Sequence, residues 1–166
     1  MTFDGDGSSF AGRRIGMLTE GATMSDVREG GCFCGLVRYR VQGPPIDAGY
    51  CHCRMCQRSA GAPVLAWGSW RSDRLAWLTA EPATFASSAE GRRRFCGACG
   101  TQLLFWTTAE PEIVDVNLVT LDEPAAIVPE YHIWTASRIP WFETTDTLPR
   151  YPDAGVDRPD LRERWR

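Results

Sequence analysis

The seven cysteines of this 166-residue chain fall into three close groups. The groups are Cys32 and Cys34; Cys51, Cys53 and Cys56; and Cys96 and Cys99. Thiolates placed this densely repel one another unless a soft cation holds them, and Zn²⁺ is the commonest such cation in proteins. The spacing therefore predicts metal–thiolate chemistry.

Four thiolates complete a tetrahedral zinc site, which is structural, whereas three leave one position open to a substrate. We expect Cys32, Cys34, Cys96 and Cys99 to share one ion, since both pairs have short spacing and neighbouring glycines. Such a site would join two distant parts of the chain, and structural zinc contributes about 10 kcal/mol or more to folding.

The middle triplet predicts a second zinc, held by Cys51, Cys53 and Cys56. Other interpretations stay open: a cluster that shares ligands with the other pairs, an iron–sulfur centre with an outside ligand, or a Cys53/Cys56 redox pair. His52 could be a fourth ligand. Its neighbours Cys51 and Cys53 would claim opposite directions from the same backbone, so we favour a polar group close to the metal.

A zinc ion with three thiolates carries a net charge of −1, which makes it a weak Lewis acid for ionising water. It would still bind a soft sulfur ligand and convert a substrate thiol into a thiolate. Arg54 and Arg58 follow the ligands closely and could offset the charge. The residues therefore favour thiol chemistry over hydrolysis.

The elements that must position these cysteines are short. Residues 36–41 alternate, with Val37, Tyr39 and Val41 on one face and arginines on the other, as in a half-buried strand. Further strands are predicted at 64–67, 75–78, 113–119 and 131–134. In 113–119 we expect the apolar residues to face inward and Asp115 and Asn117 outward. Residues 82–91 are interpreted as a connection and 137–142 as an aromatic loop. The pattern indicates a mainly β fold with few or no helices.

The ends of the chain look different from its middle. Residues 1–23 lack a periodic apolar face and are predicted to be a mobile leader, with Met24 as an alternative start. Residues 24–151 would form one domain and 152–166 a charged tail. The net charge of −3 does not call for nucleic acid or an anionic membrane. No apolar run approaches the ~20 residues of a membrane span, so a cytoplasmic protein without disulfides is expected.

Three ordered motifs together resemble a known family. They are Gly-Gly-Cys-x-Cys-Gly with a following Val-Arg-Tyr, Cys-His-Cys-x-x-Cys-Gln-Arg, and Arg-Arg-Phe-Cys-x-x-Cys-Gly-Thr. The chain is similar to the glutathione-dependent formaldehyde-activating enzymes, a family that includes centromere protein V. The similarity runs from about Glu29 to about Tyr151 and includes His132-Ile133-Trp134 and Pro140-Trp141.

The resemblance implies a β-tent fold, a structural zinc on Cys32, Cys34, Cys96 and Cys99, and a catalytic zinc on Cys51, Cys53 and Cys56. It also implies a carbon–sulfur lyase-type enzyme that joins glutathione to formaldehyde as S-(hydroxymethyl)glutathione. On this hypothesis an arginine, Arg54 or Arg58, holds a glutathione carboxylate, and His52 or Gln57 assists at the new hydroxyl.

Aromatic residues offer further candidates for the pocket. Trp67, Trp106, Trp134 and Trp141 could line it, although each is equally suited to a small core. His132 is expected to be a hydrogen-bonded structural residue. Rival functions are a non-catalytic zinc module for protein binding, a thiol/zinc redox sensor, and a lyase for another small thiol or aldehyde. The sequence does not indicate an oligomeric state.

Overall fold

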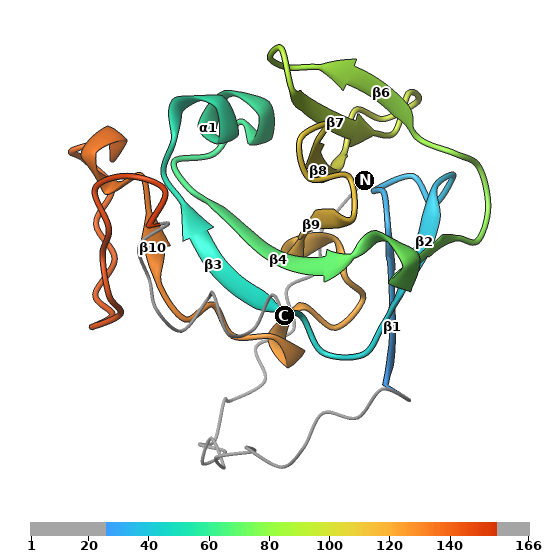
Figure 1. Cartoon of the computed structure of the whole chain (residues 1–166), viewed down its shortest axis with the longest axis horizontal. Helices are drawn as coiled ribbons and strands as arrows, with labels where there is room; N and C mark the ends of the chain where they lie inside the picture. Colours follow the sequence, from blue (N-terminus) through green and yellow to red (C-terminus); the bar gives the residue numbers. More distant parts are fainter. Residues whose placement is uncertain (1–25, 156–166) are drawn as a thin grey trace, which may run out of the picture.

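The computed structural model describes residues 26–155, which fold into two mainly antiparallel sheets. The smaller sheet has the order β1-β2-β5 and the larger one β10-β3-β4-β9-β8-β7-β6 (Figure 1). The strands of the smaller sheet are β1 (Val27–Gly31), β2 (Arg38–Gln42) and β5 (Leu75–Trp77). Those of the larger sheet are β3 (Asp47–Cys51), β4 (Leu65–Arg71), β6 (Ala83–Ala86), β7 (Gly91–Phe95), β8 (Gln102–Thr107), β9 (Ile113–Asn117) and β10 (His132–Ile133).

Helical structure among the described residues is slight. The one α-helix is α1 (Arg54–Ala60), which begins inside the cysteine triplet and ends at Gly61, where φ is 61°. The 3₁₀ turns are η1 (Ser72–Arg74), η2 (Leu118–Thr120), η3 (Pro124–Ala126) and η4 (Thr135–Ser137). The mainly β, β-tent-type fold predicted from the sequence is confirmed. None of the helices in residues 26–155 has the length and apolarity to cross a membrane.

The main core lies between the two sheets. Alternation places Val37, Tyr39 and Val41 inward, as predicted, and each is at most 1% exposed. They pack with Trp70 and Val116 of the larger sheet. Such burial of large apolar side chains is the chief favourable contribution to folding.

The opposite face of the larger sheet carries a different set of residues, and we call it the second face. In register across the strands lie Ser69 of β4, Asp115 of β9, Phe105 of β8 and Arg93 of β7. Two residues along β4, Trp67 is paired with Asn117. Helix α1 and the chain after β10 lie beside this sheet (Figure 1).

Several predicted element assignments were wrong. Asn117, expected to point into solvent, is only 3% exposed, because the second face is covered. Residues 82–91 are not a plain connection: Ala83–Ala86 form the edge strand β6, paired with β7. The strand predicted at 64–67 continues to Arg71, since Gly68, Ser69 and Trp70 are held between β3 and β9.

The C-terminal part of the prediction needs two changes. The strand expected at 131–134 is reduced to His132–Ile133, because Trp134 adopts a left-handed conformation with φ of 58°. This strand runs parallel to β3, an exception to the antiparallel pairing expected for the sheet. The predicted leader, residues 1–23, and residues 156–166 of the predicted tail lie outside the described part of the chain.

Candidate metal centre

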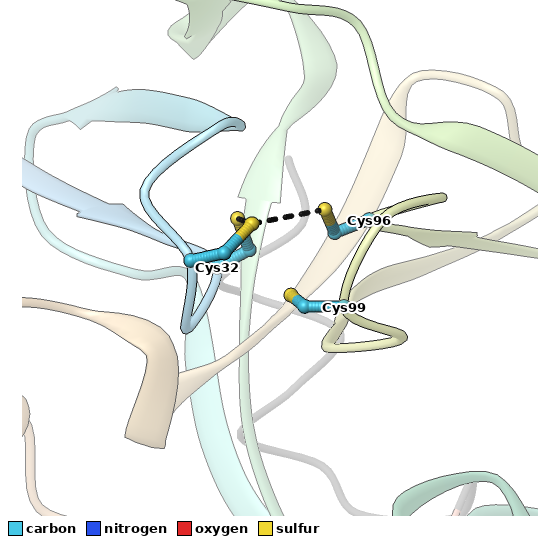
Figure 2. Close-up of side chains that lie close together, drawn as sticks. Cys32, Cys96 and Cys99 are labelled. Atoms are coloured by element: carbon cyan, nitrogen blue, oxygen red, sulfur yellow. Dashed lines mark hydrogen bonds between the residues drawn. The ribbon is translucent and has the colours of Figure 1, made fainter.

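Four cysteines from two distant loops converge on one point. The sulfur atoms of Cys32, Cys34, Cys96 and Cys99 all lie within 4.8 Å of one another, and we call this set the first cluster. Figure 2 shows Cys32 entering from the loop after β1, and Cys96 and Cys99 from the loop after β7. The two cysteine pairs are far apart in sequence, since Cys34 and Cys96 are separated by 62 positions. An ion bound by all four cysteines would therefore join the two sheets.

Two glycines shape these loops. Gly35 and Gly100 have φ of 77° and 78°, a region that side-chain-bearing residues rarely adopt. Each closes its turn by a hydrogen bond to the carbonyl of the first cysteine, Gly35 N to Cys32 O at 3.0 Å and Gly100 N to Cys96 O at 2.8 Å. The turn also directs the Val37 N–H at Cys32 Sγ, 3.3 Å away. The turn at Gly35 thus lets a backbone N–H group face a cysteine sulfur.

The remaining three cysteines form a second cluster, Cys51, Cys53 and Cys56, whose sulfur atoms also lie within 4.8 Å of one another. Cys51 is the last residue of β3, Cys53 caps helix α1, and Cys56 lies in its first turn. The Cys53 sulfur accepts the Cys56 N–H at 3.3 Å, which fixes the cap. Strand end and helix start thus supply the three thiols together, on the second face of the sheet.

The three thiols of the second cluster shift one another's pKa values in different directions. Hydrogen bonds from Cys51 and Cys56 lower the pKa of Cys53 to about 2. The pKa of Cys51 is raised by its side-chain hydrogen bonds with Cys53 and Cys56 and by burial. Contact with Cys51 lowers the pKa of Cys56, but Cys53 and burial raise it overall. Metal binding to thiols releases protons, so the affinity of this cluster for a cation will increase with pH.

Both clusters fit zinc. Four sulfurs at about 2.3 Å from zinc in a tetrahedron lie about 3.8 Å apart. In the first cluster the Sγ atoms of Cys32 and Cys34 are 3.5 Å apart, and those of Cys34 and Cys96 are 3.8 Å apart. All seven thiols are free of disulfides. The first cluster offers the four sulfur atoms that a complete tetrahedral site needs, and the second offers three.

Arg93 is a member of the second site that the sequence analysis missed. Its side chain, only 4% exposed, places Nη2 3.6 Å from Cys56 Sγ and its guanidinium 4.9 Å from the centre of the Phe105 ring. With the Gln102 amide oriented to satisfy both of its ends, Arg93 Nη1 donates to Gln102 at 3.0 Å. A buried cation beside three thiols is the arrangement that stabilises thiolate charge. Sequence alone offered only an arginine triplet before Cys96.

The two arginines predicted from the sequence lie elsewhere. Arg54 is exposed, and its Nη1 donates to Gln57 Oε1 at 2.5 Å. Arg58 is exposed on α1. Gln57 is buried, and its Nε2 donates to the carbonyls of His52 at 2.7 Å and Ser137 at 3.2 Å. Gln57 therefore connects α1 to the backbone of the second cluster and to the C-terminal segment.

His52 lies between Cys51 and Cys53 in the sequence, but its ring points away from their sulfur atoms and toward His132. Its Nε2 lies 2.8 Å from Nδ1 of His132, and His132 Nε2 lies 3.2 Å from both oxygens of Asp146. Burial lowers the pKa of His52 to about 4 and also lowers the pKa of His132. The expectation that His132 is a hydrogen-bonded structural residue is confirmed.

The four tryptophans do not gather at one site. Trp67 packs with Cys51 and Tyr131 beside the second cluster. Trp106 lines a groove of about 340 Å³ with Trp77 and Arg94. That groove lies on the other face of the sheet from Arg93, since alternate residues of β7 and β8 point to opposite sides. Trp134 is 40% and Trp141 75% exposed.

Comparison with known proteins places this arrangement in a family. The model of the glutathione-dependent formaldehyde-activating enzyme family matches residues 27–137, a segment that contains all seven cysteines. A Halomonas elongata protein named "Putative glutathione-dependent formaldehyde-activating enzyme" is 30% identical over 142 residues, which cover 77% of this chain and 90% of that protein. A crystal structure of a Rhodobacter sphaeroides protein is 25% identical, covers 61% of this chain and 97% of its own, and aligns with a TM-score of 0.47. The chain belongs to the glutathione-dependent formaldehyde-activating enzyme family.

Proposed function

We propose that this chain joins the thiol of glutathione to formaldehyde and so forms S-(hydroxymethyl)glutathione, in a zinc-dependent reaction of the carbon–sulfur lyase type. The observation that carries the proposal is the pairing of a four-cysteine cluster with a three-cysteine cluster in one small domain. Family membership supports the choice of glutathione and formaldehyde.

The two clusters would have different tasks. Cys32, Cys34, Cys96 and Cys99 would hold a structural ion that joins the loops after β1 and β7. Cys51, Cys53 and Cys56 would hold the second ion. Zinc bound by three thiolates keeps a position for a further ligand and lowers the pKa of a thiol bound there.

Arg93 balances the charge of the second cluster. Three thiolates exceed a divalent cation by one negative charge, and the guanidinium next to Cys56 supplies one positive charge in a buried position. Because like charges repel strongly away from water, a neutralised cluster accepts a substrate thiolate at lower cost. Arg93 therefore favours an anionic sulfur ligand over neutral water.

The reaction itself needs little from the protein beyond the thiolate. The thiol gives its proton to water, its sulfur electron pair forms a bond to the aldehyde carbon, the C=O π pair moves to oxygen, and that oxygen takes a proton back from water. Arg58, exposed on α1 two residues after Cys56, is our candidate for holding a glutathione carboxylate. Arg54 has the same charge but is engaged by Gln57. Gln57, with its amide nitrogen and oxygen both bonded, is assigned to positioning α1.

The test is a rate measurement, because thiols also add to formaldehyde without an enzyme. Zinc-loaded protein should accelerate the exchange between free formaldehyde and its glutathione adduct, in proportion to protein concentration. Cys53→Ser should abolish the acceleration while the first cluster and the fold persist. If the exchange is no faster with zinc-loaded protein than without it, the enzyme proposal is wrong. A zinc module for protein binding then becomes the better explanation.

A further inference from the structure

The chain contains two histidines, His52 and His132. In the structure His52 contacts His132, and His132 contacts the carboxylate of Asp146. Asp146 Oδ1 and Oδ2 lie 3.2 Å from His132 Nε2, and His132 Nδ1 lies 2.8 Å from His52 Nε2. The two imidazole rings meet at their edges, since these nitrogens are much closer than the ring centres, which are 5.1 Å apart. His52 is the residue between Cys51 and Cys53 of the second cluster.

The donors and acceptors along this chain of groups follow from Asp146. An ionised carboxylate only accepts hydrogen bonds, so His132 Nε2 must carry a hydrogen. His132 is 0% and His52 2% exposed, and burial disfavours a charged ring. A neutral His132 then has a bare Nδ1, which accepts from His52 Nε2–H and leaves His52 Nδ1 without a hydrogen.

The environment of His52 Nδ1 agrees with this order. That atom is buried and has no hydrogen-bond partner among residues 26–155. With the opposite order of hydrogens, Nδ1 would be a buried N–H group without an acceptor. Buried N–H donors without a partner are rare in proteins and costly.

His52 is also fixed through its backbone. Its N–H donates to Ile133 O at 3.0 Å, and its carbonyl accepts from Gln57 Nε2 at 2.7 Å. Together with the contact to His132, these bonds hold the residue from three directions. Because Cys51 and Cys53 flank it, these bonds restrain the backbone from which both sulfurs project.

Asp146 is also held in place by two groups other than His132. Arg150 Nη1 and the Leu148 N–H both donate to its Oδ1, at 3.1 and 3.0 Å. Tyr50 stacks on His132 with ring centres 4.8 Å apart. Asp146 lies beyond residues 27–137, the segment that the family model matches.

We propose that Asp146 is a positioning residue for the second cluster: through His132 it holds His52 as the Nε2–H tautomer and so orients the Cys51–Cys53 segment that binds metal. The tautomers are independent of the proposed function. Only the statement that this segment binds metal rests on it.

The experiment is a long-range ¹H–¹⁵N spectrum of the zinc-loaded full chain, labelled at histidine and carrying no histidine tag. With two imidazoles to observe, each ring should show hydrogen on Nε2 and none on Nδ1. In Asp146→Ala, Nδ1–H signals should appear in both rings. Asp146→Asn should keep part of the original pattern, since an amide oxygen can accept from His132. The matched control is Glu143→Gln, which removes an exposed carboxylate paired with Arg138 from the same segment.

A second readout follows zinc release to a chelator. Removing a partner that orients a metal ligand typically costs about 10-fold or more in metal affinity. Release from the second cluster should be about 10-fold faster in Asp146→Ala and unchanged in Glu143→Gln. A wild-type His52 with hydrogen on Nδ1, or patterns and release rates unaffected by Asp146→Ala, would overturn the proposal. Failure of the proposed function would instead appear as absent turnover with the tautomers as expected.

Discussion

The guanidinium of Arg93 lies 3.6 Å from the sulfur of Cys56 and connects strand β7 to helix α1 across the second face of the large sheet. The residues are 37 positions apart in sequence, and the contact depends on the register between β7 and β8, which turns Arg93 and Phe105 to the same side. It gives the three-cysteine cluster a buried positive partner.

The first prediction concerns this contact. Arg93→Met should weaken glutathione binding to the zinc-loaded protein about 10- to 100-fold, as expected for the loss of a charge-assisted buried contact of about 1.5–3 kcal/mol. Isothermal titration measures the effect. Arg93→Lys should recover part of the affinity because it keeps the charge. Equal affinities for wild type and Arg93→Met would remove Arg93 from the site.

The second prediction concerns Arg58, which is exposed where Arg93 is buried. It is exposed on α1, and we assign it to a substrate carboxylate rather than to the metal cluster. Arg58→Met should raise KM for glutathione several-fold and leave zinc content unchanged. A small thiol without carboxylates should be used equally well by the variant and the wild type. Loss of zinc from this variant would contradict the assignment.

The two clusters should respond differently to the same chemical change. Cys96→Ser should prevent stable folding, since structural zinc contributes about 10 kcal/mol and a domain has only about 5–15 kcal/mol of net stability. Cys53→Ser should fold and lose one zinc per chain. Thermal unfolding and metal analysis of the two variants make the comparison. If both variants melt alike, the division into a structural and a catalytic site is incorrect.

Asp115 should make stability depend on pH. Burial raises its pKa from 3.8 to about 6. Between these values the folded chain binds a proton that the unfolded chain has released, so this group adds stability as pH falls through 6. Asp115→Asn should therefore gain stability relative to wild type as pH rises from about 5 to 8, by about 1.4 kcal/mol, because about one pH unit of this range lies below the folded pKa. Exposed Asp73→Asn is the control. Parallel stability curves for wild type and Asp115→Asn would refute the assignment.

Gly30 tests the packing between the small sheet and the turn at Thr120. An added Cβ would lie 2.5 Å from both the Thr120 carbonyl oxygen and the Tyr39 hydroxyl. Gly30→Ala should cost about 1–3 kcal/mol of unfolding free energy through overpacking. Gly97→Ala, whose Cβ would meet only Ala83 at 3.8 Å, should cost less than about 0.5 kcal/mol. Denaturant unfolding compares the two.

The sequence predicted the cysteine groups because ligand type and spacing are local properties. Gly35 and Gly100 mark both loops, and alternation at Val37, Tyr39 and Val41 identified a core strand. Arg93 and Asp146 were missed because their contacts depend on strand register and on a loop that returns to the sheet. Asn117 was misplaced because polar alternation identifies two faces but does not show that the second one is covered.

The central claim is that the second cluster binds a metal with a position open to a thiol. The most direct test replaces zinc with Co²⁺, whose absorption reports the number of sulfur ligands, and titrates glutathione into the loaded protein. We expect two metal ions per chain and an increase in sulfur-to-cobalt absorption that saturates with glutathione and is absent in Cys53→Ser. One metal ion per chain after reloading, or a spectrum indifferent to glutathione, would contradict the central claim.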